Sequence, residues 1–171
     1  MPFAYYQRLT KKQQAIYRLS DEIHSIPLPR ERLFDAVIAD LEIALKKEHC
    51  AETQRACQQL SDQLNQQLKI MPVQIKVYEA RPSDHTGELH GLYTPDEENN
   101  TARIDIWMRT AHQKKVVAFR TFLRTLLHEL CHHFDYEYFK LPETFHTEGF
   151  YKRESNLFHQ LVKEKKERKV K

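Results

Sequence analysis

Apolar positions recur every three or four residues through most of the first 68 residues, as in helices that bury one face. The clearest stripe runs from Leu33 to Leu45, and a shorter stripe lies on either side of it. Pro27 and Pro29 separate the first stripe from the second, because proline cannot continue a helix interior. The pattern predicts three packing helices between about Leu9 and Leu68.

The period changes to two after Pro72, and two is the period of half-buried strands. Apolar and polar side chains alternate in VQIKVYEA, residues 73–80, and again in ARIDIWM, residues 102–108. Between them GELHGLY is a weaker strand candidate, which the polar turn TPDEENN joins to the last strand. These segments predict a small antiparallel sheet.

The helical period returns from about Lys114 to Phe139, and Pro142 ends it. A last helix is expected from His146 or Thr147 onward. Helices with one short sheet indicate a mostly helical α+β fold, in which a short antiparallel-containing sheet packs on the helix after it. We expect a single domain over residues 1–171, composed of an N-terminal helical part at 1–70, a core at 73–161 and a basic tail at 162–171.

The amino-acid composition argues against several classes of protein. The chain has only 3 glycines, which argues against a turn-dense all-β fold and against glycine-rich phosphate loops. Its cysteines, Cys50, Cys57 and Cys131, include no Cys-x-x-Cys pair, which argues against a disulfide framework and a zinc ribbon. The first residues lack the apolar core of a signal peptide, and no run of about 18 apolar residues occurs. The sequence therefore predicts a cytoplasmic protein without a membrane segment.

The net charge of +3 is concentrated at the C-terminus. The run from Lys163 to Lys171 has six basic and two acidic residues and hence a charge of +4, which leaves about −1 for the rest of the chain. A nucleic-acid-binding domain normally carries its basic residues on one folded face. We interpret the tail as a solvated end, and nucleic-acid binding stays open as an alternative.

The stretch LLHELCHHFD contains the pattern H-E-x-x-H in His128, Glu129 and His132. On a helix, residues four apart lie one turn above each other, so both imidazoles can reach one metal ion and the glutamate can reach a water on it. Asp135 lies on the same face and can accept a hydrogen bond from a ligand imidazole. The alternatives are a solvated aspartate at the helix end and a polar helix face with incidental histidines.

Two histidines do not complete a catalytic zinc site, which normally takes three protein ligands and leaves the fourth position to water. The segment PETFHTEGFYKRES offers His146, Glu148 and Glu154. His146 is favoured, because a turn at Pro142 lets the chain reverse and aim it at the motif. Glu154 is the alternative third ligand, since a glutamate on the following helix completes the other common ligand set.

HELCH, preceded by a strand hairpin and followed by HTEGF at the start of the next helix, resembles the SprT-like zinc metallopeptidases, a family of zincins. The resemblance covers roughly Val73 to Leu161. It implies a zincin-like core in which the two motif histidines and His146 bind Zn²⁺. It also implies that Glu129 is the catalytic acid and base.

The leading expectation is a zinc-dependent metallopeptidase, a hydrolase that cleaves a peptide or protein substrate. Glu129 would take a proton from water and pass it to the leaving amine. Tyr151, Arg153 and His159 are unranked candidates to stabilise a tetrahedral oxyanion. Two alternatives stay open, namely a catalytically silent zincin-like binding module and a DNA-associated SprT-like protease that acts on DNA–protein crosslinks and is recruited by the basic tail.

Overall fold

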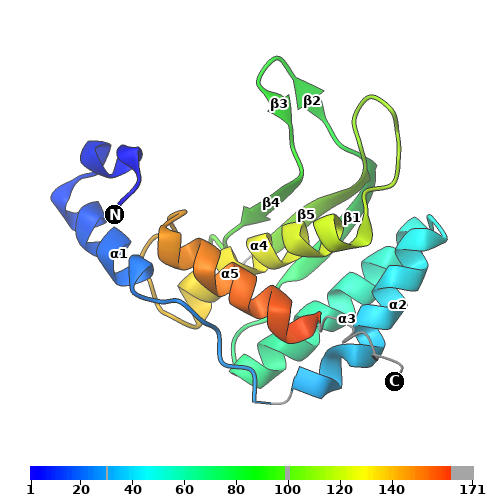
Figure 1. The fold of residues 1–171 in the computed structure, drawn as a ribbon, viewed down its shortest axis with the longest axis horizontal. Coiled ribbons are helices and arrows are strands. Elements are labelled where there is room, and N and C mark those ends of the chain that lie inside the picture. The colour runs from blue at the N-terminus through cyan, green and yellow to red at the C-terminus, as the bar shows by residue number, and fades with distance from the viewer. Residues whose placement is uncertain (30, 99–100, 163–171) are drawn as a thin grey trace, which may run out of the picture.

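The computed structural model describes residues 1–29, 31–98 and 101–162, so the basic run and the nucleic-acid alternative that depends on it lie outside the described residues. The described part is α+β, as the sequence predicts (Figure 1). No helix in it is both long and apolar enough to cross a membrane. Its elements are η1 (Ala4–Arg8), α1 (Lys11–Asp21), η2 (Glu31–Phe34), α2 (Asp35–Lys46), α3 (Cys50–Leu68), β1 (Gln74–Ala80), β2 (Ser83–Asp84), β3 (Gly87–Glu88), β4 (Gly91–Thr94), β5 (Arg103–Arg109), α4 (Phe119–Glu137) and α5 (Glu148–Leu161).

The main sheet has the strand order β1-β5-β4 and is mixed. β4 pairs antiparallel with β5, as expected, but β1 pairs parallel with β5, with Val77 opposite Ile106. The expected antiparallel-containing sheet is therefore confirmed, but antiparallel pairing is wrong for the pair of β1 and β5. The alternation of apolar and polar residues identifies the buried face of a strand, but it does not identify the strand with which it pairs. Here the chain passes through the β2–β3 hairpin and β4 before β5 returns between β1 and β4.

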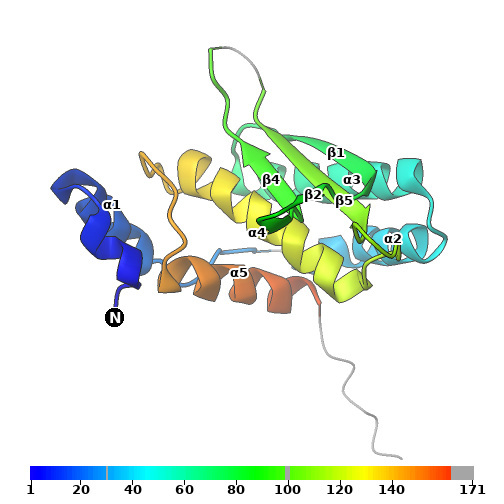
Figure 2. The same cartoon turned by 90° about the horizontal axis from the view of Figure 1, so that it is seen from above.

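α4 lies between the sheet and α5 (Figure 2). Its apolar stripe is buried, with Leu123, Leu126, Leu127 and Leu130 all at 0% exposure. The facing strand β5 contributes Ile104 and Ile106 to the same core cluster. Because α4 is packed on both sides, side chains that project from it start from a fixed backbone.

The helices of the N-terminal part of the chain pack at two different places. α2 packs on α3, which covers β1, whereas α1 docks on α5 at the other end of the molecule (Figure 1). The connection between them runs along α5, where the Ile26 N–H donates to Asn156 Oδ1 at 3.1 Å and the Ile26 C=O accepts from Gln160 at 2.8 Å. The hydrophobic pattern predicts these helices but not which of them α1 packs against.

Candidate metal centre

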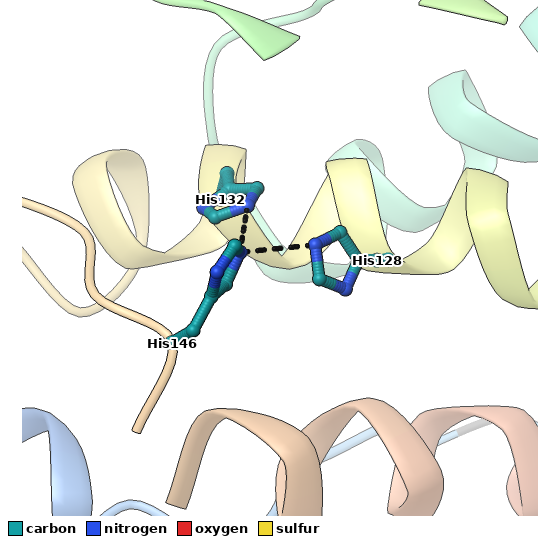
Figure 3. Close-up of side chains that lie close together, drawn as sticks. All are labelled: His128, His132 and His146. Atoms are coloured by element: carbon teal, nitrogen blue, oxygen red, sulfur yellow. Dashed lines mark hydrogen bonds between the residues drawn. The ribbon is translucent and has the colours of Figure 1, made fainter. Parts of the chain in front are cut away.

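Three histidine side chains converge on one point beside α4. His128 and His132 project from the same face of α4, and His146 reaches them from the loop before α5 (Figure 3). The Nε2 atom of His146 lies 3.1 Å from Nε2 of His128 and 3.0 Å from Nε2 of His132. In the described part of the chain, these three form a group whose ligand atoms all lie within 4.8 Å of one another.

The loop between α4 and α5, residues 138–147, delivers His146 to this point. The Leu141 N–H donates to the Asp135 C=O at 2.9 Å, which turns the chain back at the end of α4. Thr147 then caps α5, since its hydroxyl accepts a hydrogen bond from the Phe150 N–H at 2.9 Å. The histidine precedes this cap, so the first turn of α5 fixes its backbone. The chain reversal that the sequence predicts is present.

Hydrogen bonds orient the His132 ring. Its Nδ1 atom lies 2.8 Å from Thr144 Oγ1, and that hydroxyl donates to Asp135 Oδ2 at 2.8 Å. Because the hydroxyl proton is directed at the carboxylate, Nδ1 is the donor to Thr144 and Nε2 carries the lone pair. The sequence predicts that Asp135 bonds a ligand imidazole directly. This expectation is corrected, because Thr144 lies between the two side chains.

Asp135 is completely buried, so the alternative of a solvated helix end is wrong. Its carboxylate pairs with Arg153, whose Nη2 lies 2.8 Å and whose Nε lies 3.1 Å from Oδ1. A buried carboxylate is tolerated where a guanidinium binds it in this way. The two residues lie on different helices, 18 positions apart in the chain.

Glu154 supports His128 and does not join the three nitrogens. Its Oε1 atom lies 3.4 Å from Nδ1 of His128, whereas Nε2 of that ring faces His146. In this position the carboxylate favours the tautomer with a proton on Nδ1 and a free lone pair on Nε2. Glu148 is also outside the group and pairs with Lys152 at 3.0 Å.

Two of the three separations between the nitrogens suit a tetrahedral metal ion. Zinc binds histidine nitrogen at about 2.0–2.1 Å, so nitrogens at two tetrahedral positions lie about 3.3 Å apart. The observed separations of 3.1 Å and 3.0 Å are close to this value. Imidazole ligands suit zinc and several other transition metals, so the donor set fits a cation of this class.

Electrostatics favour neutral imidazoles at two of the three positions. Burial lowers the pKa of His132 to about 3, and the charges of His128 and His146 act in the same direction. His146 is exposed on one side, and partial burial and then the charge of His128 lower its pKa. Burial also acts downward on His128, but the hydrogen bond and charge of Glu154 outweigh it and raise that pKa. A neutral imidazole is the form that binds a metal ion.

Glu129 lies next to the histidines and below the edge strand β4. Its side chain is 8% exposed, and burial raises the pKa of its carboxyl above the ordinary value. The backbone N–H of Tyr93 in β4 donates to this carboxylate. Gly91 permits the close approach, because a Cβ there would lie 3.0 Å from Glu129 Cγ. The raised pKa makes this carboxylate a better proton acceptor than an exposed glutamate.

A cavity of about 350 Å³ opens beside His128 and Glu129. Residues of α4 form one side of it, including Arg124, and Gly91 in β4 lies on the other side. Glu154 contributes from α5. The space can receive an amino-acid side chain next to the carboxylate and the histidines.

The remaining candidates for stabilising an oxyanion lie at different positions relative to the three histidines. The ring of Tyr151 lies 5.8 Å from that of His146, so this residue stays a candidate to contact a substrate. Arg153 is completely buried and its N–H groups already have acceptors, whereas His159 is exposed and packs on a neighbouring ring in α5. The sequence does not single out Thr144, and its only local signal is its place two residues before His146.

Comparison of the chain with protein-family models, curated proteins and solved structures finds no match. The chemistry of the site is therefore inferred from its geometry. The Nε2 atoms of three imidazoles face one point, with a buried carboxyl, a sheet edge and a cavity next to them.

Proposed function

We propose that the protein is a zinc-dependent peptidase with a zincin-like core that resembles the SprT-like metallopeptidases. The observation that carries the proposal is the position of Glu129, a buried carboxyl beside three converging imidazoles. Within the described residues Glu129 forms no ion pair, and an unpaired carboxyl at 8% exposure costs free energy. A catalytic role explains why this position holds glutamate and not an apolar residue.

The ligands proposed for zinc are His128, His132 and His146. A bound zinc ion would polarise the scissile carbonyl and lower the pKa of a water molecule at its open fourth position. Thr144 and Glu154 orient two of the imidazoles, so that each presents Nε2 to the ion.

Glu129 acts as the proton carrier in this proposal. Its carboxylate takes a proton from the attacking water, and the resulting acid gives a proton to the leaving amine. Burial supports the first step, because the raised pKa makes the carboxylate a better proton acceptor. The Tyr93 N–H keeps the carboxylate oriented between the two steps.

The substrate is proposed to be an extended peptide segment. β4 is an edge strand of the described sheet, with β5 on one side, and it passes over Glu129 at Gly91 and Tyr93. An extended chain that pairs with such an edge gains backbone hydrogen bonds, and adjacent cavities select its side chains. The cavity beside His128 lies where a side chain next to the scissile bond would enter.

Metal removal tests the proposed function. Zinc-loaded protein is expected to cleave members of a peptide library, a strong chelator is expected to abolish the cleavage, and one equivalent of Zn²⁺ is expected to restore it. Mass spectrometry reports the products, and far-UV circular dichroism checks that the chelated protein stays folded. Cleavage that persists after complete metal removal would contradict a role of the ion in the reaction.

Thr144→Val is expected to weaken zinc binding by about 10–100-fold, because it removes the hydroxyl that orients the His132 ring and joins it to Asp135. Competition with a chromophoric chelator measures the dissociation constant. The matched control is Thr144→Ser, which keeps the hydroxyl and is expected to bind zinc within about 2-fold of the wild type. Equal affinities of the valine and serine variants would show that this hydroxyl does not support the site.

A further inference from the structure

The N-terminal segment, residues 3–23, lies against the loop and helix that carry His146 (Figure 1). The Tyr5 hydroxyl donates to the C=O of His146 at 2.8 Å. One residue further on, the hydroxyl groups of Thr147 and Ser20 lie 3.1 Å apart, and both side chains are at 0% exposure. The N-terminal segment therefore contacts the backbone of the third histidine and the cap that follows it.

Arg153 joins this segment to the support of His132. Its Nη1 donates to the C=O groups of Ser20 at 2.9 Å and Ile23 at 3.0 Å, and its Nη2 donates to Ser20 Oγ at 2.9 Å. Its Nε and Nη2 also donate to Asp135. The guanidinium carries five N–H donors in a planar fork. These contacts direct its donors both to Asp135 and to the end of the N-terminal segment. The single ammonium of a lysine cannot reproduce them.

α1 approaches α5 closely at Gly149. A Cβ at this position would lie 2.5 Å from the C=O oxygen of Asp21 and 2.6 Å from that of Ser20. The Gly149 N–H also donates to Asp21 Oδ1 at 3.0 Å. Only glycine permits this contact, which places the end of α1 directly beside the first turn of α5.

Polar contacts contribute much of the attachment of α1. The helix buries only Ile16, Tyr17 and Ser20, so its apolar contribution to the core is small. Hydrogen bonds have strict geometry, unlike apolar contacts, which tolerate small displacements. The position of α1 and the position of the loop before α5 are therefore tied to each other.

We propose that the N-terminal segment is a positioning element of the metal centre, and that Arg153 is the positioning residue that links it to His132 through Asp135 and Thr144. The proposal rests on the proposed function only in that the three histidines bind a metal ion. Docking of the segment orders the His146 backbone and the His132 ring together, so the ion binds more tightly when the segment is docked. By linkage, a bound ion strengthens docking by the same factor.

The test compares zinc dissociation constants by competition with a chromophoric chelator. Arg153→Lys keeps the charge but not the donor geometry, and it is expected to weaken zinc binding by about 10–100-fold. Tyr5→Phe removes one hydroxyl and keeps the ring, and it is expected to weaken binding by about 5-fold. The control Leu64→Ala lies in the core of α3, away from α1, and is expected to lower the melting temperature without changing zinc affinity.

Hydrogen exchange supplies the readout that a loss of stability would not change. Zinc is expected to slow amide exchange in α1 of the wild type, and this effect is expected to vanish in Arg153→Lys while the slowing in α4 remains. Unchanged zinc affinity in both Arg153→Lys and Tyr5→Phe would overturn the positioning role and leave the proposed function intact. A second result would separate the two proposals in the other direction. If zinc binding is weakened in both variants but the wild-type protein cleaves no peptide, the positioning role is supported and the proposed function is contradicted.

Discussion

Glu129→Gln is expected to lower kcat for peptide hydrolysis by about 10²–10⁴-fold, because glutamine cannot take a proton from water or return one to the leaving amine. The variant is expected to keep its metal ion, since the three imidazoles remain. Its amide oxygen can still accept the hydrogen bond from the Tyr93 N–H, so the fold around the site is preserved. Steady-state kinetics on a cleaved library peptide measure kcat, and elemental mass spectrometry measures the metal content.

A control for this substitution lies on the same helix. Glu137→Gln makes the same change at the end of α4, beyond His128 and His132, and is expected to leave kcat within about 2-fold of the wild type. A Glu129→Gln variant that turns over at the wild-type rate would remove the carboxyl from the mechanism. The site would then be a metal-binding centre that uses a different group as its base.

His146→Ala is expected to abolish stoichiometric zinc binding, because only His128 and His132 would remain of the three nitrogens that face one point. Metal content per chain after zinc reconstitution and desalting measures the loss. The change removes one side chain at the surface of the loop, so the melting temperature of the metal-free protein is expected to stay close to that of the wild type.

Glu154→Ala separates the two ligand sets that the sequence left open. Its carboxylate faces Nδ1 of His128, so the variant is expected to retain zinc with an affinity that is about 10–100-fold lower. Zinc that is lost in Glu154→Ala and kept in His146→Ala would assign the third ligand to the glutamate. The expected pattern is the reverse.

The sequence predicts those parts of the site that depend on short spacings. His128 and His132 are four residues apart on a helix, and helical geometry alone brings them to one face. The turn after α4 made His146 the favoured third residue, and its Nε2 lies beside theirs. The α+β composition of the fold followed from the change between periods of 3.6 and 2.

Other features depend on contacts between distant residues, for which a single sequence carries no signal. The parallel pairing of β1 with β5 is one such feature, and the position of α1 on α5 is another. His133 follows His132 directly in the chain, yet its side chain is buried and hydrogen-bonded to the C=O of Met71 at 2.8 Å. The four-residue spacing places His132, and not His133, on the face of His128, but the sequence carries no signal for the bond between His133 and Met71.

The support of the ligands is the part of the site that was least predictable. The sequence offers Arg153 as a candidate to stabilise an oxyanion, whereas its partners are Asp135 on α4 and the end of α1. Buried charges pair with whichever opposite charge the fold places next to them, and that neighbour is fixed by tertiary packing. Thr144 shows the same limit, because a loop threonine carries no pattern that marks it as a partner of histidine.

The most direct test of the central claim is the analysis of products after zinc-loaded wild-type protein acts on a peptide library in H₂¹⁸O. The proposed chemistry adds one water across a peptide bond, so new C-terminal carboxylates that carry one ¹⁸O are expected, and they should be absent when the protein is metal-free. A protein that holds one zinc ion per chain at the three histidines and still produces no labelled termini would contradict a peptidase and indicate a metal-containing binding module.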